Sequence, residues 1–102
     1  MFVAISTYLR PPDEVEALAP AHIAWQMQHY ANGRFLGSGR RVPPTGAVII
    51  GREESLEAFR ALLAEDPFQQ QGLVRYDIFE FTPVPLPRRS EELEAFLQKP
   101  FQ

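Results

Sequence analysis

The order in which strand-like and helix-like segments alternate constrains this chain more than any other feature. Strand patterns, rich in β-branched and aromatic residues, cover 2–9, 34–42, 47–51 and 73–82. One helical pattern lies between the first two strands and another between the last two. This β-α-β-β-α-β order predicts an α+β fold of the ferredoxin-like type. Right-handed crossovers would place both helices on one face of a four-stranded antiparallel sheet.

The main helix is predicted over 20–32, after a short acidic helical approach. Pro20 suits a first helical turn, and Gly33 is a typical signal for a helix end. The apolar spacing i, i+4, i+7, i+8 predicts a buried stripe of Ile23, Met27, Tyr30 and Ala31. On the same geometry, Trp25 faces away from the monomer core and His29 is interpreted as a solvated helix residue.

The second helix begins near Ser55, a preferred N-cap residue, and ends before Asp66. Its predicted apolar face consists of Leu56, Phe59, Leu62 and Leu63. Beyond the last strand, alternating prolines predict an extended linker: Pro83, Pro85 and Pro87. A short final helix from about Ser90 is interpreted as a packing element or a dimer clasp. We therefore expect one α+β barrel domain over 1–82 and a proline-rich linker with a helical tail over 83–102.

Both faces of the predicted sheet carry apolar side chains. In the third strand, Ala47 and Ile49 point one way, whereas Val48 and Ile50 point the other. Two helices on one side leave the second apolar face uncovered, and a chain of 102 residues has only a modest core. We expect a second copy to cover that face and form a homodimer, sheet to sheet. The alternative is that the C-terminal tail folds over it.

Charge and composition argue against several classes of function. A net charge of −3 provides no basic face for nucleic acid. The chain has no cysteine and only two histidines, without a ligand cluster, so neither a metal nor another cofactor is expected. No apolar run approaches the roughly 20 residues that span a bilayer. No signal segment is recognisable, and we expect a cytoplasmic protein without membrane contact.

The strongest candidates for chemistry are His22, near the start of the main helix, and Asp66, at the end of the second. The positive end of the helix dipole disfavours an imidazolium at His22, which predicts a neutral ring able to act as a base. Asp66 precedes Pro67 and fits a helix N-cap, and the same carboxylate could orient the imidazole. Two simpler interpretations stay open: a boundary His22 that bonds a carbonyl, and an Asp66 that only caps.

The second strand supplies candidate contacts for a ligand. Gly37 and Gly39 inside it suggest a bulge or a close approach by another group. Ser38 is small enough to line a pocket, and it is a candidate substrate contact. Arg40, with Arg41, is interpreted either as a solvated strand end or as an anion clamp for a carboxylate substrate.

Several of these segments, taken in order, resemble the YciI-like (YCII-related) family of dimeric α+β barrel proteins. They are Pro20-Ala21-His22, Asn32-Gly33-Arg34-Phe35-Leu36 with Ser38-Gly39, Ser55-Leu56-Glu57-Ala58, Asp66-Pro67-Phe68 and Gly72-Leu73. The resemblance implies a fold similar to muconolactone isomerases and cofactor-free monooxygenases, with His22 and Asp66 as the active-site pair. Arg40 departs from the family pattern, in which proline often follows the glycine.

These observations predict a cofactor-independent enzyme that acts on a small lactone, enol or activated carbonyl. His22 would be the general acid/base and Asp66 would orient it, in an isomerisation or an elimination such as dehalogenation. The alternative is a non-catalytic module that binds a small molecule, or an accessory dimer, in which His22 only donates a hydrogen bond. A structural dimer without ligand is a third interpretation, and it predicts no enclosed polar pocket around His22.

Overall fold

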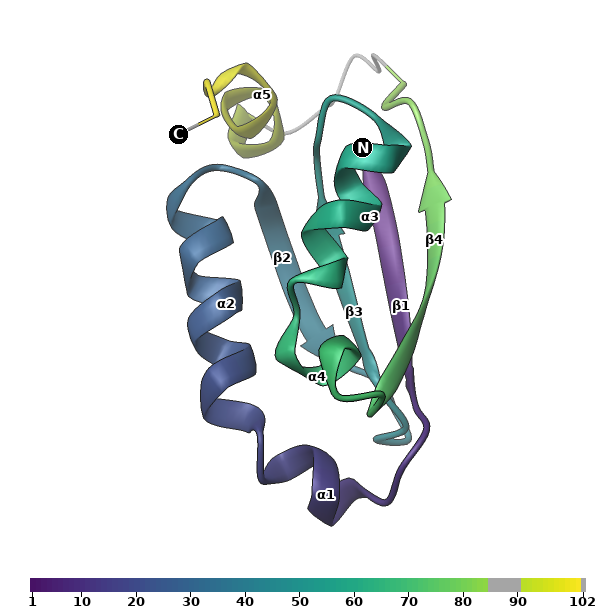
Figure 1. Ribbon diagram of the computed structural model, residues 1–102. Coiled ribbons are helices and arrows are strands. Elements are labelled where there is room, and N and C mark those ends of the chain that lie inside the picture. The colour runs from purple at the N-terminus through teal and green to yellow at the C-terminus, as the bar shows by residue number, and fades with distance from the viewer. Residues whose placement is uncertain (85–90, 102) are drawn as a thin grey trace.

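Four strands form an antiparallel sheet, as the sequence predicted. They are β1 (Phe2–Tyr8), β2 (Phe35–Arg40), β3 (Ala47–Gly51) and β4 (Val74–Glu80), arranged β2-β3-β1-β4 (Figure 1). β1 pairs with β3 and β4, and β2 pairs with β3. The structure is a computed structural model that describes residues 1–84 and 91–101. The predicted α+β class with a ferredoxin-like sheet is confirmed.

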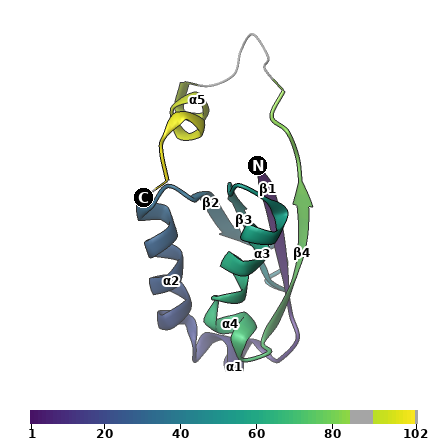
Figure 2. The same ribbon diagram turned by 45° about the horizontal axis from the view of Figure 1, so that its top comes forward.

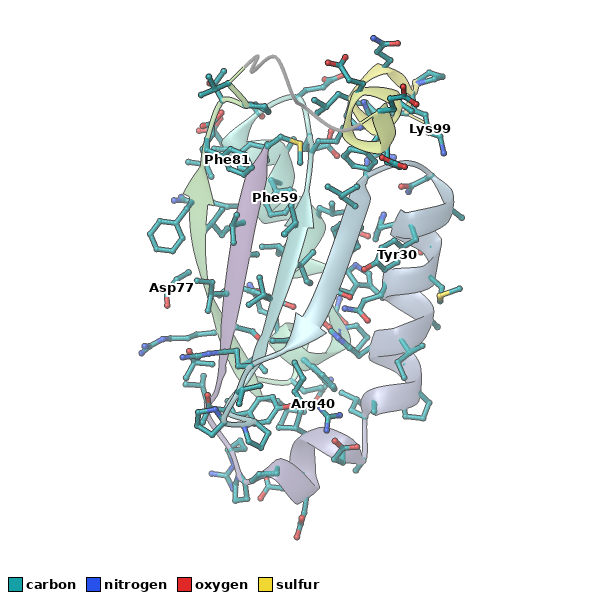
Figure 3. The ribbon with its side chains drawn as sticks, turned by 180° about the vertical axis from the view of Figure 1, so that it is seen from behind. Tyr30, Arg40, Phe59, Asp77, Phe81 and Lys99 are labelled. Carbon is teal, nitrogen blue, oxygen red and sulfur yellow. The ribbon has the colours of Figure 1, made fainter. Side chains whose placement is uncertain are left out.

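Five helices accompany the sheet in these described residues. They are α1 (Pro12–Glu16), α2 (Ala19–Ala31), α3 (Leu56–Ala64), α4 (Pro67–Gln70) and α5 (Glu91–Gln98). Figure 1 shows α2, α3 and α4 on one side of the sheet, and Figure 3 shows the opposite face without a helix over it. Two predicted end signals are confirmed. Ser55 caps α3 through a 3.0 Å bond from the Ala58 amide, and Gly33 follows α2 with a φ of 84°.

The core lies between the sheet and the helices α2 and α3, and it is largely aromatic. Phe2 of β1 stacks on Phe59 of α3, with ring centroids 4.6 Å apart. The other buried members of this cluster are Ala4, Trp25, Phe35, Ile49, Leu62 and Leu63. A second cluster of Val15, Phe68 and Val74 joins α1 and α4 to the start of β4. This second cluster positions the helices that surround the candidate site.

The buried stripe of α2 differs from the predicted one. His22, Trp25 and His29 are only 8%, 6% and 4% exposed, whereas Ile23 and Met27 are 53% and 61% exposed. The predictions that Trp25 faces away from the core and that His29 is solvated are therefore wrong. The buried positions follow i, i+3, i+7 and form a regular helical stripe. Because two of the three are histidines, a pattern of apolar residues alone cannot detect it.

β2 contains the bulge that its glycines suggested. Its pairing with β3 passes over Leu36, which is an extra residue on β2. One extra residue reverses the in–out alternation of every residue that follows. Ser38 is therefore paired with the buried Ile49 and faces the side covered by the helices, as does Arg40 two residues later. Without the bulge, both side chains would face the opposite side of the sheet.

The sheet face opposite the helices is largely apolar. It carries Val3, Ile5, Val48, Ile50 and Phe79, and β4 adds the charged Arg75 and Asp77 toward one end of it. Phe79 is 57% exposed. Figures 1 and 2 place α5 at one end of the sheet, beside the turn between α2 and β2. The alternative that the tail covers this face is thus wrong for the described part of the tail.

The helix α5 is held in place by Arg52, whose side chain is buried. The guanidinium donates to the backbone carbonyls of Gly33, Leu97 and Lys99. It also lies over the rings of Phe96 and Phe101, 5.0 and 4.4 Å from their centroids. Burial lowers the pKa of Arg52, and the neighbouring Arg34 lowers it further. The helix therefore packs on its own chain. Three residues used to predict the linker and the helix start lie outside the described residues: Pro85, Pro87 and Ser90.

Candidate functional site

The two strongest sequence candidates meet in the structure. Nδ1 of His22, in α2, lies 2.7 Å from Oδ1 of Asp66, at the junction of α3 and α4. Both side chains are buried, although they are 44 positions apart in the chain. A carboxylate accepts hydrogen bonds and does not donate them, so Nδ1 carries the shared proton. In the neutral ring this leaves Nε2 as an acceptor.

Asp66 caps α4 and contacts His22 at the same time. Its Oδ1 also accepts from the backbone N–H of Phe68 at 3.0 Å, and its Oδ2 accepts from the hydroxyl of Tyr76 at 2.5 Å. The cap predicted for Asp66 is confirmed. Three donors compensate the burial of a carboxylate that has no exposed surface.

Tyr76, on β4, is the member of this cluster that the sequence analysis did not identify. Burial raises the pKa of Tyr76, and the adjacent Asp66 carboxylate raises it further. The hydroxyl therefore keeps its proton and donates it to that carboxylate. A signal for this residue existed in the alternation of Val74, Tyr76 and Ile78 on one face of the strand, because an inward-facing tyrosine requires a partner for its hydroxyl.

Aromatic rings hold the imidazole of His22 in one orientation. Phe68 stacks on it with centroids 4.0 Å apart and an interplanar angle of 6°, and Trp25 lies 5.6 Å away at 37°. Phe68 follows Asp66 by two residues, so a single turn supplies both the carboxylate and the stacking ring. Such a ring is oriented before any ligand binds, as a functional group on rigid elements should be.

A cavity of about 220 Å³ lies against His22, bounded by α1, α2 and the sheet. Its polar lining comes from Ser6, Glu16, His22, Gln26, Ser38 and Arg40. Its apolar lining includes Tyr8, Val15, Ile23 and Phe68. A cavity of about 150 Å³ already accommodates benzene. This cavity therefore has the size of a molecule with about one ring.

Three of the four predicted site residues line this one cavity, and Asp66 lies behind His22. Ser38 Oγ accepts from the Tyr30 hydroxyl at 2.7 Å, which leaves the proton of Ser38 available for a ligand. Arg40 lies at the end of β2 next to α1 (Figure 3). Its Nη2 is 3.4 Å from Oε1 of Glu16.

Of Arg40 and Arg41, which were interpreted either as a solvated strand end or as an anion clamp, only Arg40 lies at the cavity. The Arg41 guanidinium donates instead to the Ser6 carbonyl at 3.3 Å and to the Thr7 hydroxyl at 3.0 Å. These bonds tie Arg41 to β1. Arg41 directly follows the last residue of β2, and successive residues of an extended chain point to opposite faces, which explains why Arg40 lines the cavity and Arg41 does not.

One wall of the cavity depends on Gly46, just before β3. A Cβ atom at this position would collide with the backbone oxygen of Ser6. Glycine therefore permits the close approach of β1 and β3 here. The Ser6 hydroxyl then accepts from the Ala47 amide at 2.9 Å, so its position in the cavity wall is fixed.

Family comparison agrees with the resemblance seen in the sequence. The model of the YCII-related domain matches residues 1–82. The chain belongs to the YCII-related family. Comparison with curated proteins gives no match.

Two solved structures are similar to this YCII-related chain. One is 5-chloro-2-hydroxyhydroquinone dehydrochlorinase (TftG) from Burkholderia phenoliruptrix AC1100, in complex with 2,5-dihydroxybenzoquinone. It is 20% identical, with a TM-score of 0.66, over 80% of this chain and 94% of that chain. The other is a variant of SnoaB, a cofactor-independent oxygenase from Streptomyces nogalater. It is 21% identical, with a TM-score of 0.47, over 86% and 95% of the two chains. The first similarity establishes a shared fold.

Among residues 1–84 and 91–101, no three His, Asp or Glu side chains gather where they could hold a metal ion. Within the same ranges, no helix is long and apolar enough to cross a membrane.

Proposed function

We propose that this YCII-related protein is a cofactor-independent enzyme that transfers a proton on a small lactone, enol or activated carbonyl. The observation that carries the proposal is the environment of His22. Its Nδ1 donates to the buried Asp66, and the ring lines a cavity of ligand size. His22 is the general acid/base, and Asp66 is the positioning residue that selects the tautomer and stabilises the imidazolium. Ser38 and Arg40 bind the substrate.

The proposed reaction begins when Nε2 of His22 removes a proton from the carbon next to the substrate carbonyl, or from the hydroxyl of an enol. The electron pair of the broken bond moves into an enolate. In an isomerisation, the imidazolium returns the proton to a different atom of the same molecule. In an elimination, the electron pair of the enolate forms a new double bond while a halide leaves, and water later removes the proton from the imidazolium. Both routes balance in atoms and electrons without a redox partner.

Elimination is the first reaction class to test. One solved structure that shares the fold is named 5-chloro-2-hydroxyhydroquinone dehydrochlorinase. A substituted single ring of that kind matches the cavity of about 220 Å³ beside His22. Lactones and small enols of one ring form the second group of test compounds.

The test of catalysis is turnover by the His22→Ala variant. Loss of a general acid/base lowers turnover by about 10² to 10⁴. The matched control is His29→Ala, on the same helix and equally buried, which leaves turnover within about two-fold because His29 is not part of the cavity lining. Full activity of His22→Ala would contradict the proposal. Binding without turnover in the wild type would favour the non-catalytic binding module.

We also infer that the protein is a homodimer through the apolar face of the sheet. An apolar face of this kind is unfavourable in water, and two-fold symmetry allows a second copy to cover it with the same surface. Light scattering should give a dimer for the wild type and a monomer for Phe79→Lys, which places a charge on that face. Leu9→Lys, at an exposed apolar residue beyond the end of β1, should remain dimeric. A monomeric wild type would contradict the inference.

A further inference from the structure

Two ion pairs involve the helix α1, and their geometries differ. Arg10 and Glu14 are four residues apart and are joined by two hydrogen bonds of 2.8 and 3.0 Å. Glu16 and Arg40 are 24 residues apart and are joined by one contact of 3.4 Å. The first pair joins α1 to the residues just before it. The second connects α1 to β2, and both of its members line the cavity that contains His22.

The Glu16–Arg40 pair stands at the solvent end of this cavity. The two side chains are 58% and 65% exposed, whereas the side chain of His22 is 11% exposed. In the lining, Glu16 and Arg40 carry opposite charges, His22 contributes an imidazole and Tyr8 contributes a phenol. The cavity therefore has a charged mouth and an imidazole at its inner end, with apolar walls that include Val15 and Phe68.

We propose that Arg40 binds a carboxylate group of the substrate and that Glu16 occupies Arg40 until the substrate displaces it. This inference rests on the proposed function, because it takes the cavity to be the substrate site. A free carboxylate can offer a guanidinium two parallel hydrogen bonds, whereas Glu16 supplies one long bond. An exposed ion pair of this kind contributes little to stability, so its opening costs little.

The substrate class follows from the two ends of the cavity. The molecule carries a carboxylate at Arg40 and presents an acidic proton to Nε2 of His22. The volume of about 220 Å³ limits the body between these groups to about one ring. Neutral molecules of the same shape bind less tightly, because they cannot replace Glu16 as the partner of Arg40. The bulge at Leu36 is essential to this selectivity, since it turns Arg40 toward the cavity.

Binding of two matched probes to the full chain tests the inference. The probes are 4-hydroxybenzoate and 4-hydroxybenzamide, which share the ring and the hydroxyl and differ in charge. The fluorescence of Trp25, the single tryptophan, reports binding because its ring lies 5.6 Å from that of His22. The acid should bind about ten-fold more tightly than the amide at low salt. The difference should shrink as the salt concentration rises.

Variants assign this preference to the two residues. Arg40→Gln should reduce the affinity for the acid about ten-fold, to that of the amide, and leave the affinity for the amide unchanged. Glu16→Gln should tighten binding of the acid by about three-fold, because the internal competitor is lost. Arg10→Gln and Glu14→Gln are the matched controls. They break the other ion pair of α1 and should change neither affinity.

Equal affinities for the two probes, no binding of the acid, or a preference that survives Arg40→Gln would overturn the inference. If Glu16→Gln bound the acid no more tightly than the wild type, Glu16 would not compete with the substrate for Arg40. None of these results depends on turnover. A fully active His22→Ala variant that keeps the Arg40-dependent preference would remove the proposed catalysis and support the carboxylate site. If turnover required His22 but binding did not depend on Arg40, the proposed catalysis would be supported and the carboxylate site would be removed.

Discussion

The two histidines of α2 lie seven residues apart, are both buried, and each faces a carboxylate at the end of α3. Their surroundings nevertheless differ. His22 contacts Asp66 at 2.7 Å, whereas Nε2 of His29 lies 3.4 Å from Oε1 of Glu65 without the alignment of a hydrogen bond. Asp66 is fully buried and accepts three hydrogen bonds, whereas Glu65 is exposed.

The second nitrogen of each ring completes the contrast. Nδ1 of His29 accepts from the side-chain amide of Asn32 at 2.9 Å, and the ring packs edge-on against Trp25 and Phe35. The ring of His29 is therefore packed among protein side chains, whereas that of His22 borders a cavity. A buried histidine beside a carboxylate therefore occurs both in packing and at sites of chemistry. What distinguishes a site is a ring held on one side and open to a ligand on the other.

The largest expected effect is on turnover. It is tested by replacing Asp66 with asparagine and, for comparison, Glu65 with glutamine. Asp66→Asn should lower turnover by about 10² to 10⁴, because an amide can donate to Nδ1 and so favour the wrong tautomer of His22. Glu65→Gln should leave turnover within about two-fold. Nitrogen NMR of the imidazole measures the tautomer directly. If Asp66→Asn and Glu65→Gln changed turnover equally, or if Asp66→Asn left the tautomer of His22 unchanged, the two histidines would not differ in function.

A smaller effect is expected on stability when each histidine is replaced by leucine. His22→Leu leaves a buried carboxylate oxygen with one donor fewer and should lower the free energy of unfolding by about 1–3 kcal/mol. His29→Leu replaces a ring whose Nε2 has no hydrogen-bond partner, so its effect should stay below about 1.5 kcal/mol. Urea unfolding at one fixed protein concentration measures both. A larger loss for His29→Leu would contradict this order.

The smallest effect concerns Tyr76, the donor to Asp66 that has no counterpart at Glu65. Because folding raises the pKa of Tyr76, its contribution to stability is complete below about pH 10, the value of an unfolded tyrosine. Above that pH the unfolded chain releases the proton and the folded chain keeps it. Stability then falls, by up to about 1.4 kcal/mol per pH unit from this group.

The variant Tyr76→Phe lacks this titrating group. At neutral pH it should be less stable by about 0.5–1.5 kcal/mol, because Asp66 Oδ2 loses its donor. From pH 9 upward its stability should fall less steeply than that of the wild type. Unfolding free energies across neutral and alkaline pH measure both slopes. Parallel curves would show that Tyr76 ionises equally in the folded and unfolded chains.

Local signals made parts of the site predictable from the sequence. Asp66 before Pro67 specified a cap, and that cap places the carboxylate at the start of α4 in the structure. The order of the elements then brought this turn to the same end of the sheet as the start of α2. His22 and Asp66 were therefore predicted as a pair, and the structure places them in hydrogen-bond contact. Tyr76 was not predicted, because its role depends on a carboxylate ten residues away on another element.

The sequence alone was sufficient to predict the order of strands and helices along the chain, the helix ends, the caps and the apolar character of both sheet faces. These features depend on backbone preferences and on periodicity, which a few neighbouring residues specify. The tertiary structure alone decided which stripe of α2 is buried and that Arg40 rather than Arg41 lines the cavity. The rotation of a helix and the register beyond a bulge are set by packing against residues distant in the chain. A one-residue difference in either places a different side chain at the site.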